Sequence, residues 1–133
     1  MSFFRRVTII DGVEIPFLPY KDLQLLFDNF ITNSKEKLII KECAEYHNIT
    51  IDEVNSDYFF DFLHDCGYII DDEFLSTMYI GTKIIEIDED DSSSSRKIST
   101  LPQFPHINNS IFEFIKNVFP EYHIDRYLVN WVL

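Results

Sequence analysis

Hydrophobic residues recur along this chain with two different spacings, and each spacing predicts a different element. Apolar residues three and four positions apart are typical of helices that bury one face. With their caps, these helices are expected over residues 21–32, 34–46, 56–67, 110–119 and 122–133. Short β-branched runs around two turn-forming dipeptides predict strands. We therefore expect an α+β fold, in which four or five amphipathic helices pack with one or two small antiparallel β-hairpins.

The two hairpins are predicted from their turn residues. Asp11-Gly12 suits a type I′ turn, which needs positive φ at both central residues, so strands are expected over Val7–Ile10 and Val13–Phe17. Gly81-Thr82 suits a type II′ turn, because glycine is favoured at its first central position. A helix running through Tyr79 is the competing interpretation of this second segment.

Small polar residues and one glycine predict where the helices begin and end. Ser34, Ser56 and Ser110 are expected as N-caps, since a hydroxyl can accept a hydrogen bond from an N–H group of the first turn. Thr50-Ile51-Asp52-Glu53 has the spacing of a capping box, which predicts a short helical turn. Gly67 is expected to end the third helix in the left-handed conformation.

Composition indicates a globular protein with a single domain over residues 1–133. Hydrophobic residues make up 46% of the chain and aromatic residues 16%, far more than a disordered acidic chain carries. No apolar run approaches the roughly 18 residues of a membrane span, and the first ten residues lack the apolar core of a signal peptide. A cytoplasmic location is therefore expected.

Two cysteines, Cys43 and Cys66, do not make a disulfide framework. Both lie on predicted apolar helix faces and are expected to be reduced thiols of the core. The carboxylates around Cys66 are expected to raise the pKa of its thiol, which disfavours a nucleophilic role.

The net charge of −12 is concentrated in one segment. Residues 52–91 contain thirteen acids and one base, Lys83, whereas the other 93 residues contain ten acids and ten bases. A field of one sign steers oppositely charged molecules toward a protein. The asymmetry therefore indicates a basic partner, and it argues against direct binding to nucleic-acid phosphates, which requires a basic surface.

The acidic segment also offers a candidate contact surface. Asp57, Asp61 and Asp65 recur every four residues, so they share one helix face on which like charges repel. An ordinary solvated helix face is the alternative interpretation. The predicted partner-binding residues are Asp57, Asp61, Asp65, Asp71, Asp72, Glu73, Glu86, Asp88, Glu89, Asp90 and Asp91.

A metal site is a further candidate in the same segment. Asp61 and His64 lie three residues apart, with Asp57 and Asp65 beside them, so two or three ligands could converge. No zinc-ligand spacing accompanies them, and the stretch from Asp88 onward lacks the glycine and glutamate of an EF-hand loop. We therefore expect no metal, no cofactor and no catalytic residue.

Residues 88–105 combine an acid run, four serines and two prolines, which predicts a mobile loop. The acids that precede Ser92–Ser95 also match the context in which some kinases phosphorylate serine, and phosphate would add negative charge. A plain surface loop is the simpler interpretation.

In general character, and chiefly in DFLHDCGYIIDDE and IEIDEDD, the chain resembles the small acidic immunity proteins that neutralise bacterial nuclease toxins, including those of contact-dependent growth inhibition systems. The resemblance implies a stoichiometric antitoxin, not an enzyme, that covers the active site or substrate-binding site of a basic toxin. An exposed Tyr or Phe would serve as its anchor. The alternatives are a viral or phage protein that mimics DNA, a structural subunit of a complex, and a small enzyme. A homo-oligomer is left open.

Overall fold

The computed structural model describes residues 4–34, 37–72, 75–90, 97–100 and 109–132. Its helices are α1 (Tyr20–Asn33), α2 (Leu38–His47), the short 3₁₀ helix η1 (Ile51–Glu53), α3 (Ser56–Asp65) and α4 (Asn109–Val118). Its strands are β1 (Phe4–Pro16), β2 (Ile69–Asp72), β3 (Thr77–Asp90), β4 (Lys97–Thr100) and β5 (Asp125–Val132). The fold is α+β, as predicted. None of the helices within these ranges is long and apolar enough to cross a membrane.

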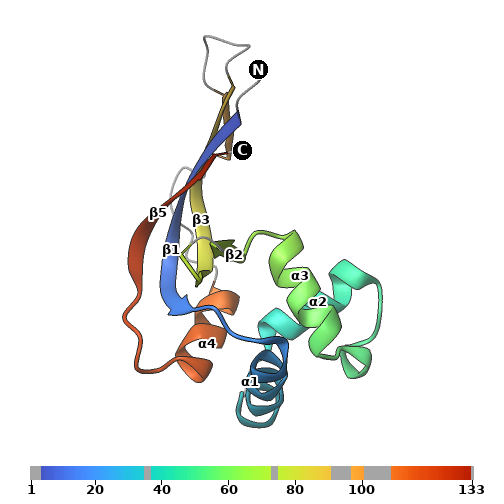
Figure 1. The fold of residues 1–133 in the computed structure, drawn as a ribbon. Coiled ribbons are helices and arrows are strands. Elements are labelled where there is room, and N and C mark those ends of the chain that lie inside the picture. The colour runs from blue at the N-terminus through green and yellow to red at the C-terminus, as the bar shows by residue number, and fades with distance from the viewer. Residues whose placement is uncertain (1–3, 35–36, 73–74, 91–96, 101–108, 133) are drawn as a thin grey trace.

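The strands form one antiparallel sheet in the order β2-β3-β1-β5, with β4 also paired to β3. β1 and β3 pair over their full length, from Phe4 opposite Asp90 to Pro16 opposite Thr77. The helices gather at one end of the sheet, and the long strands extend well beyond them (Figure 1).

Both predicted hairpin turns are wrong, because each turn dipeptide lies inside a long strand. Gly12 of β1 stands directly opposite Gly81 of β3. A Cβ atom on either glycine would overlap the backbone of the other strand. The two glycines therefore permit a close approach of two strands, which is the other reason for glycine in a sheet. β1 is also a central strand of the sheet, not half of a small hairpin.

The predicted last helix is also wrong, because residues 125–132 form strand β5. This strand pairs with β1 from Asp125 opposite Gly12 to Val132 opposite Arg5. Val129 is buried while its neighbour Leu128 is 63% exposed, the alternation of a strand and not of a helix. Pairing with β1 satisfies the backbone of this segment and overrides its helical spacing of apolar residues.

The segment predicted as a mobile loop contains strands as well. β3 continues to Asp90, and β4 returns beside it with Lys97 opposite Asp88. The loop prediction over residues 88–105 is therefore wrong for these strands. The Ser92–Ser95 run lies outside the described residues.

The helices bury their predicted stripes against one face of the sheet. Phe27 and Phe30 of α1, Phe59 of α3 and Phe114 of α4 form an aromatic cluster, in which Phe59 lies 5.2 Å from Phe27 and 5.2 Å from Phe114 between ring centroids. Around it lie Val13, Ile15, Ile39, Ile40, Leu63, Ile69, Met78, Ile80, Ile111 and Ile115. The predicted apolar faces of these helices are confirmed except at Tyr46 and Cys66, which are exposed, and Phe62 and Phe114 are buried in addition.

Two of the capping predictions are confirmed. The backbone N–H of Thr50 donates to Glu53 Oε1 at 3.1 Å, and the Thr50 hydroxyl donates to the same oxygen at 2.9 Å. The second bond of the capping box, from the N–H of Glu53 to the Thr50 hydroxyl, is present as well. Gly67, which follows α3, has φ of +76°, the left-handed conformation expected there.

The three serine N-caps are wrong. α2 begins only after Lys37, and Ser34 is buried with no hydrogen-bond partner for its hydroxyl among the described residues. α3 is capped by Asn55, whose side chain accepts a hydrogen bond from the N–H of Tyr58. Ser110 lies inside α4. An amide side chain one residue earlier thus takes the place predicted for Ser56.

Candidate protein-binding surface

α3 separates the acidic residues from the core, as its periodicity predicts. Phe59 and Leu63 are buried, while Asp57, Asp61 and Asp65 are exposed on the opposite side of the helix. Within the described part of the chain, Asp57 and Asp61 make no hydrogen bond or ion pair. Their carboxylates are therefore available to a cation supplied from outside.

Aromatic side chains lie directly beside these carboxylates. The hydroxyl of Tyr46, at the end of α2, donates to Asp65 Oδ2 at 2.7 Å. The ring of His47 lies 4.9 Å from the ring of Tyr46 and 4.9 Å from the ring of Tyr58, measured between centroids. His47 Nε2 donates to the carbonyl oxygen of Tyr58 at 2.8 Å, which ties α2 to α3.

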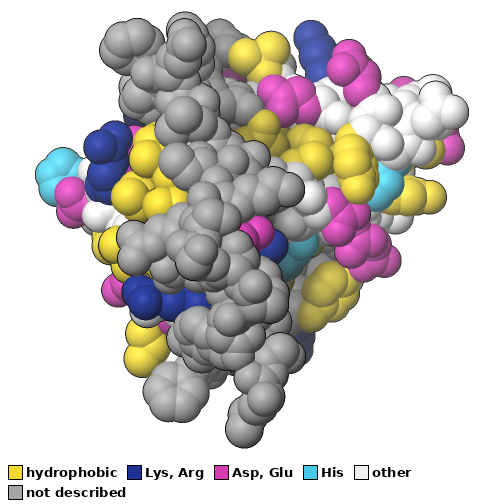
Figure 2. Space-filling view, turned by 90° about the horizontal axis from the view of Figure 1, so that it is seen from above, with side chains coloured by type: hydrophobic (Ala, Val, Ile, Leu, Met, Phe, Trp, Pro, Cys, Tyr) yellow, Lys and Arg dark blue, Asp and Glu magenta, His cyan; other side chains and the backbone are white. Residues whose placement is uncertain are grey.

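These residues form what we call the acidic-aromatic surface: Tyr46, His47, Asp57, Tyr58, Asp61 and Asp65. Tyr46 is 47% exposed and Tyr58 is 39% exposed. Figure 2 shows Asp and Glu side chains around hydrophobic side chains and a histidine on the side where α2 and α3 lie in Figure 1. Large exposed aromatic side chains are typical of contact residues in protein interfaces.

The hydrogen bond to Asp65 raises the pKa of Tyr46, because the carboxylate stabilises the protonated phenol. The Tyr46 hydroxyl therefore stays a donor at neutral pH. It orients the Asp65 carboxylate, and it leaves the second carboxylate oxygen to a partner. A rigid carboxylate loses less conformational freedom when it binds a cation.

Asp71 and Asp72, also predicted as partner contacts, are half-buried in β2 and engaged locally. Asp71 Oδ2 lies 3.1 Å from His64 Nε2, and His64 Nδ1 lies 2.8 Å from the carbonyl oxygen of Phe60. Acceptors on both ring nitrogens favour the doubly protonated imidazole, so the pKa of His64 is raised, chiefly by its bond to Asp71. Asp72 Oδ1 accepts a hydrogen bond from the N–H of Leu75.

Because the folded-state pKa of His64 is raised, its contribution to stability is complete below pH about 6.5 and is lost as the pH rises through the folded pKa. We expect His64→Gln to lower the free energy of unfolding at pH 5.5–6 and to have little effect at pH 8.5. The side chain of His64 is 39% exposed, so the loss should be below about 1 kcal/mol. Urea denaturation at each pH measures it.

The matched control for this titration is His123→Gln, at an exposed histidine for which the described residues provide no ion-pair partner. This variant should show no such trend with pH. A constant difference between wild type and His64→Gln across pH 5.5–8.5 would contradict the prediction.

Two acids of β3, Glu86 and Asp88, are paired within the sheet. The extra residue of a β-bulge, Ile84, places Lys83 and Glu86 on one face, where Lys83 Nζ donates to Glu86 Oε1 at 3.0 Å. Glu86 is buried, and Arg6 binds Asp88 through two hydrogen bonds of 2.8 and 3.3 Å. The bond to Asp88 raises the pKa of Arg6. Glu86 and Asp88 thus connect β1 to β3, and we leave them out of the binding surface.

For two of the remaining predicted contact residues, the structure describes only the backbone. The backbone of Glu89 and Asp90 lies at the end of β3, opposite Arg5 and Phe4. Glu73 and Asp91 lie outside the described residues. The structure therefore divides the predicted acidic face into an exposed part on α3 and a part in β2 and β3 that is engaged by neighbours.

The two cysteines, both candidate nucleophiles, lie in different surroundings. Cys43 is buried, which raises its pKa to about 12, but Cys66 is exposed, so its predicted place in the core is wrong. The pKa of Cys66 is raised as predicted, first by partial desolvation and then by Asp65. Over the described ranges, no three His, Cys, Asp or Glu side chains are grouped to hold a metal ion.

Sequence reasoning missed the aromatic half of the surface. Tyr46 is at the end of the apolar stripe of residues 34–46, and its spacing from Cys43 leaves open whether it faces the core. The position of Tyr58, three residues before Asp61 and off the buried stripe of α3, is a signal from which its exposure could have been predicted. No family model, no curated protein and no solved structure matches this chain.

Proposed function

We propose that this protein is a stoichiometric inhibitor of a basic protein, an immunity protein that neutralises a nuclease-type toxin by covering its active site or substrate-binding site. The observation that carries the proposal is the acidic-aromatic surface, where Asp57 and Asp61 lie unpaired next to exposed Tyr58. Its carboxylates would occupy the lysines and arginines with which a nuclease binds phosphates.

The aromatic side chains support direct contact with the partner, in addition to attraction between opposite charges. Tyr46 and Tyr58 are held by α2 and α3 through ring contacts and hydrogen bonds, so little freedom is lost when they are covered. Exposed charge alone steers a partner and is weakened by salt, whereas a covered aromatic side chain slows dissociation. The surface combines both, as inhibition at one-to-one stoichiometry requires.

The test begins with the immobilised chain, used to capture its partner from lysate of the source cell at about 0.15 M and about 0.5 M salt. We expect a basic protein, captured less well at the higher salt. One molar equivalent of the chain should inhibit its activity on nucleic acid. A captured partner that is not basic contradicts the proposal.

Charge reversal at the surface then tests the site. Asp61→Lys with Asp65→Lys should weaken the affinity for the captured partner about 100-fold or more, measured by calorimetry, because like charges would face each other across the interface. Asp28→Lys with Asp125→Lys makes the same change in net charge at exposed positions of α1 and β5, and it should weaken binding less than about fivefold. Equal effects of the two double variants would overturn the assignment of the surface.

A further inference from the structure

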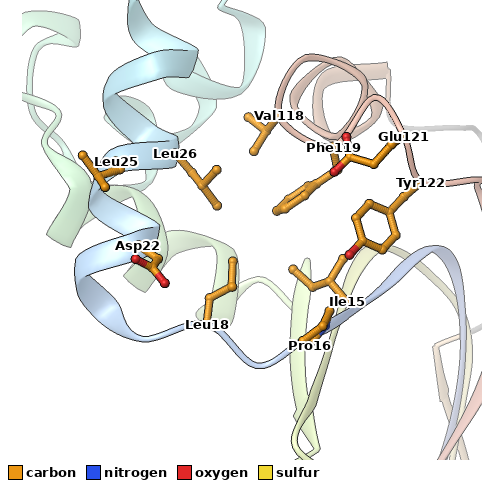
Figure 3. Close-up of a pocket in the computed structure, with 10 residues that line it drawn as sticks. All are labelled: Ile15, Pro16, Leu18, Asp22, Leu25, Leu26, Val118, Phe119, Glu121 and Tyr122. Atoms are coloured by element: carbon orange, nitrogen blue, oxygen red, sulfur yellow. The ribbon is translucent and has the colours of Figure 1, made fainter.

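A groove of ≈ 410 Å³ opens between the beginning of α1 and the end of α4. Leu26 of α1 faces Val118 and Phe119 across it (Figure 3). Ile15 of β1 and the ring of Tyr122 form the side toward the sheet. The volume is within the range of roughly 300–1,000 Å³ that is typical of binding pockets.

Large apolar side chains around the groove remain exposed. Leu25 lines it and is 57% exposed, off the buried stripe of α1. Tyr122, on the other side of the groove, is 36% exposed. Apolar side chains that stay exposed along a groove mark an interaction site. A ligand that covers both Leu25 and Tyr122 must extend across the groove, which fits a protein segment.

Two carboxylates at the groove indicate that the bound protein segment is positively charged. Asp22 stands on the α1 side of the groove and Glu121 on the α4 side (Figure 3). Both are exposed, and within the described residues neither makes an ion pair or a side-chain hydrogen bond. Each would gain from a cation at the margin of a bound apolar segment.

We propose that this groove binds an amphipathic basic segment of a partner protein, with aliphatic or aromatic side chains in the groove and Lys or Arg beside Asp22 and Glu121. The mode is that of a helix laid in an apolar groove, with anchors spaced along one face. The site uses α1 and α4, whereas the acidic-aromatic surface uses α2 and α3. It therefore does not depend on the proposed function.

The test uses the full chain and a fluorescein-labelled helical peptide of about fourteen residues, with Leu along one face and Lys on both flanks of that face. Fluorescence anisotropy at about 0.15 M salt should give micromolar binding. Replacing the lysines of the peptide by Glu should weaken binding at least about tenfold. Replacing its leucines by Ser should do the same. Full retention of binding by the Ser peptide would show attraction by net charge alone and overturn the proposal.

Variants of the chain locate the site. Asp22→Asn with Glu121→Gln, and separately the exposed-site change Leu25→Ser, should each weaken binding of the Leu-Lys peptide at least about fivefold. Asp28→Asn with Asp125→Asn is the matched charge control and should stay within about twofold of wild type.

Asp61→Asn with Asp65→Asn distinguishes the groove from the acidic-aromatic surface, and this variant should bind the peptide as wild type does. If the groove variants bind as wild type, or if the Asp61 and Asp65 variant alone loses the peptide, the groove is not the site. Neither result bears on capture of a basic partner by the acidic-aromatic surface.

Discussion

Replacement of Phe59 by alanine is expected to lower the free energy of unfolding by about 3–5 kcal/mol. Phe59 is fully buried, and its ring contacts those of Phe27, Phe30, Phe60 and Phe114 at centroid distances of 5.2 to 6.2 Å. Removal of the ring would leave a cavity between α1, α3 and α4 that surrounding side chains can fill only in part. Urea denaturation measures the loss as a lower midpoint with an unchanged slope.

The control is Phe17→Ala, which removes the same atoms from a side chain that is 48% exposed, and its cost should be below about 1.5 kcal/mol. Since domains of this size are stable by about 5–15 kcal/mol, Phe59→Ala could leave little folded protein. Phe59→Leu keeps most of the volume and should lie between the two. A cost for Phe59→Ala no larger than that for Phe17→Ala would contradict the packing described for this cluster.

Gly12→Ala is expected to lower the free energy of unfolding by about 2–3 kcal/mol. The added methyl group would overlap the backbone of Ile80 and Gly81, which cannot rotate away as a flexible side chain could. Gly81→Ala should cost a similar amount, because its methyl group would meet the backbone of Asp11 and Gly12. Chemical denaturation of both single variants and of the double variant checks this.

Both glycines lie at the same close contact between β1 and β3. The double variant should therefore lose clearly less free energy of unfolding than the sum of the losses of the two single variants. Leu128→Ala, at an exposed position of β5, is the control within the sheet and should cost below about 0.5 kcal/mol. Full stability of Gly12→Ala would mean that β1 and β3 are not in contact at this register.

These glycines also show what local sequence patterns could not predict. Asp11-Gly12 and Gly81-Thr82 carry real turn signals, and a turn needs only four residues to be recognised. The close approach of β1 to β3 depends on two segments nearly seventy residues apart, which no local pattern relates. The same limit explains β5, whose apolar residues have helical spacing but whose backbone pairs with the first strand of the chain.

The binding surface divides in the same way. Periodicity predicts that Asp57, Asp61 and Asp65 share one side of a helix, and they do. Periodicity could not predict that Arg6 and Lys83 reach the acids of β3, since these contacts follow from strand pairing and a bulge. It also could not place Tyr46 outside the core, because that depends on how α2 lies against α3.

By itself, the sequence determined the α+β class, the apolar faces of α1 to α4, the capping box at η1 and the left-handed Gly67. Each of these depends on residues within one or two helical turns, whose side-chain preferences act over that range. Tertiary structure decided the long central strands, β5, the pairing of Glu86 and Asp88, and the meeting of tyrosines with carboxylates. Those features come from contacts between distant segments, where burial and backbone pairing outweigh local propensity.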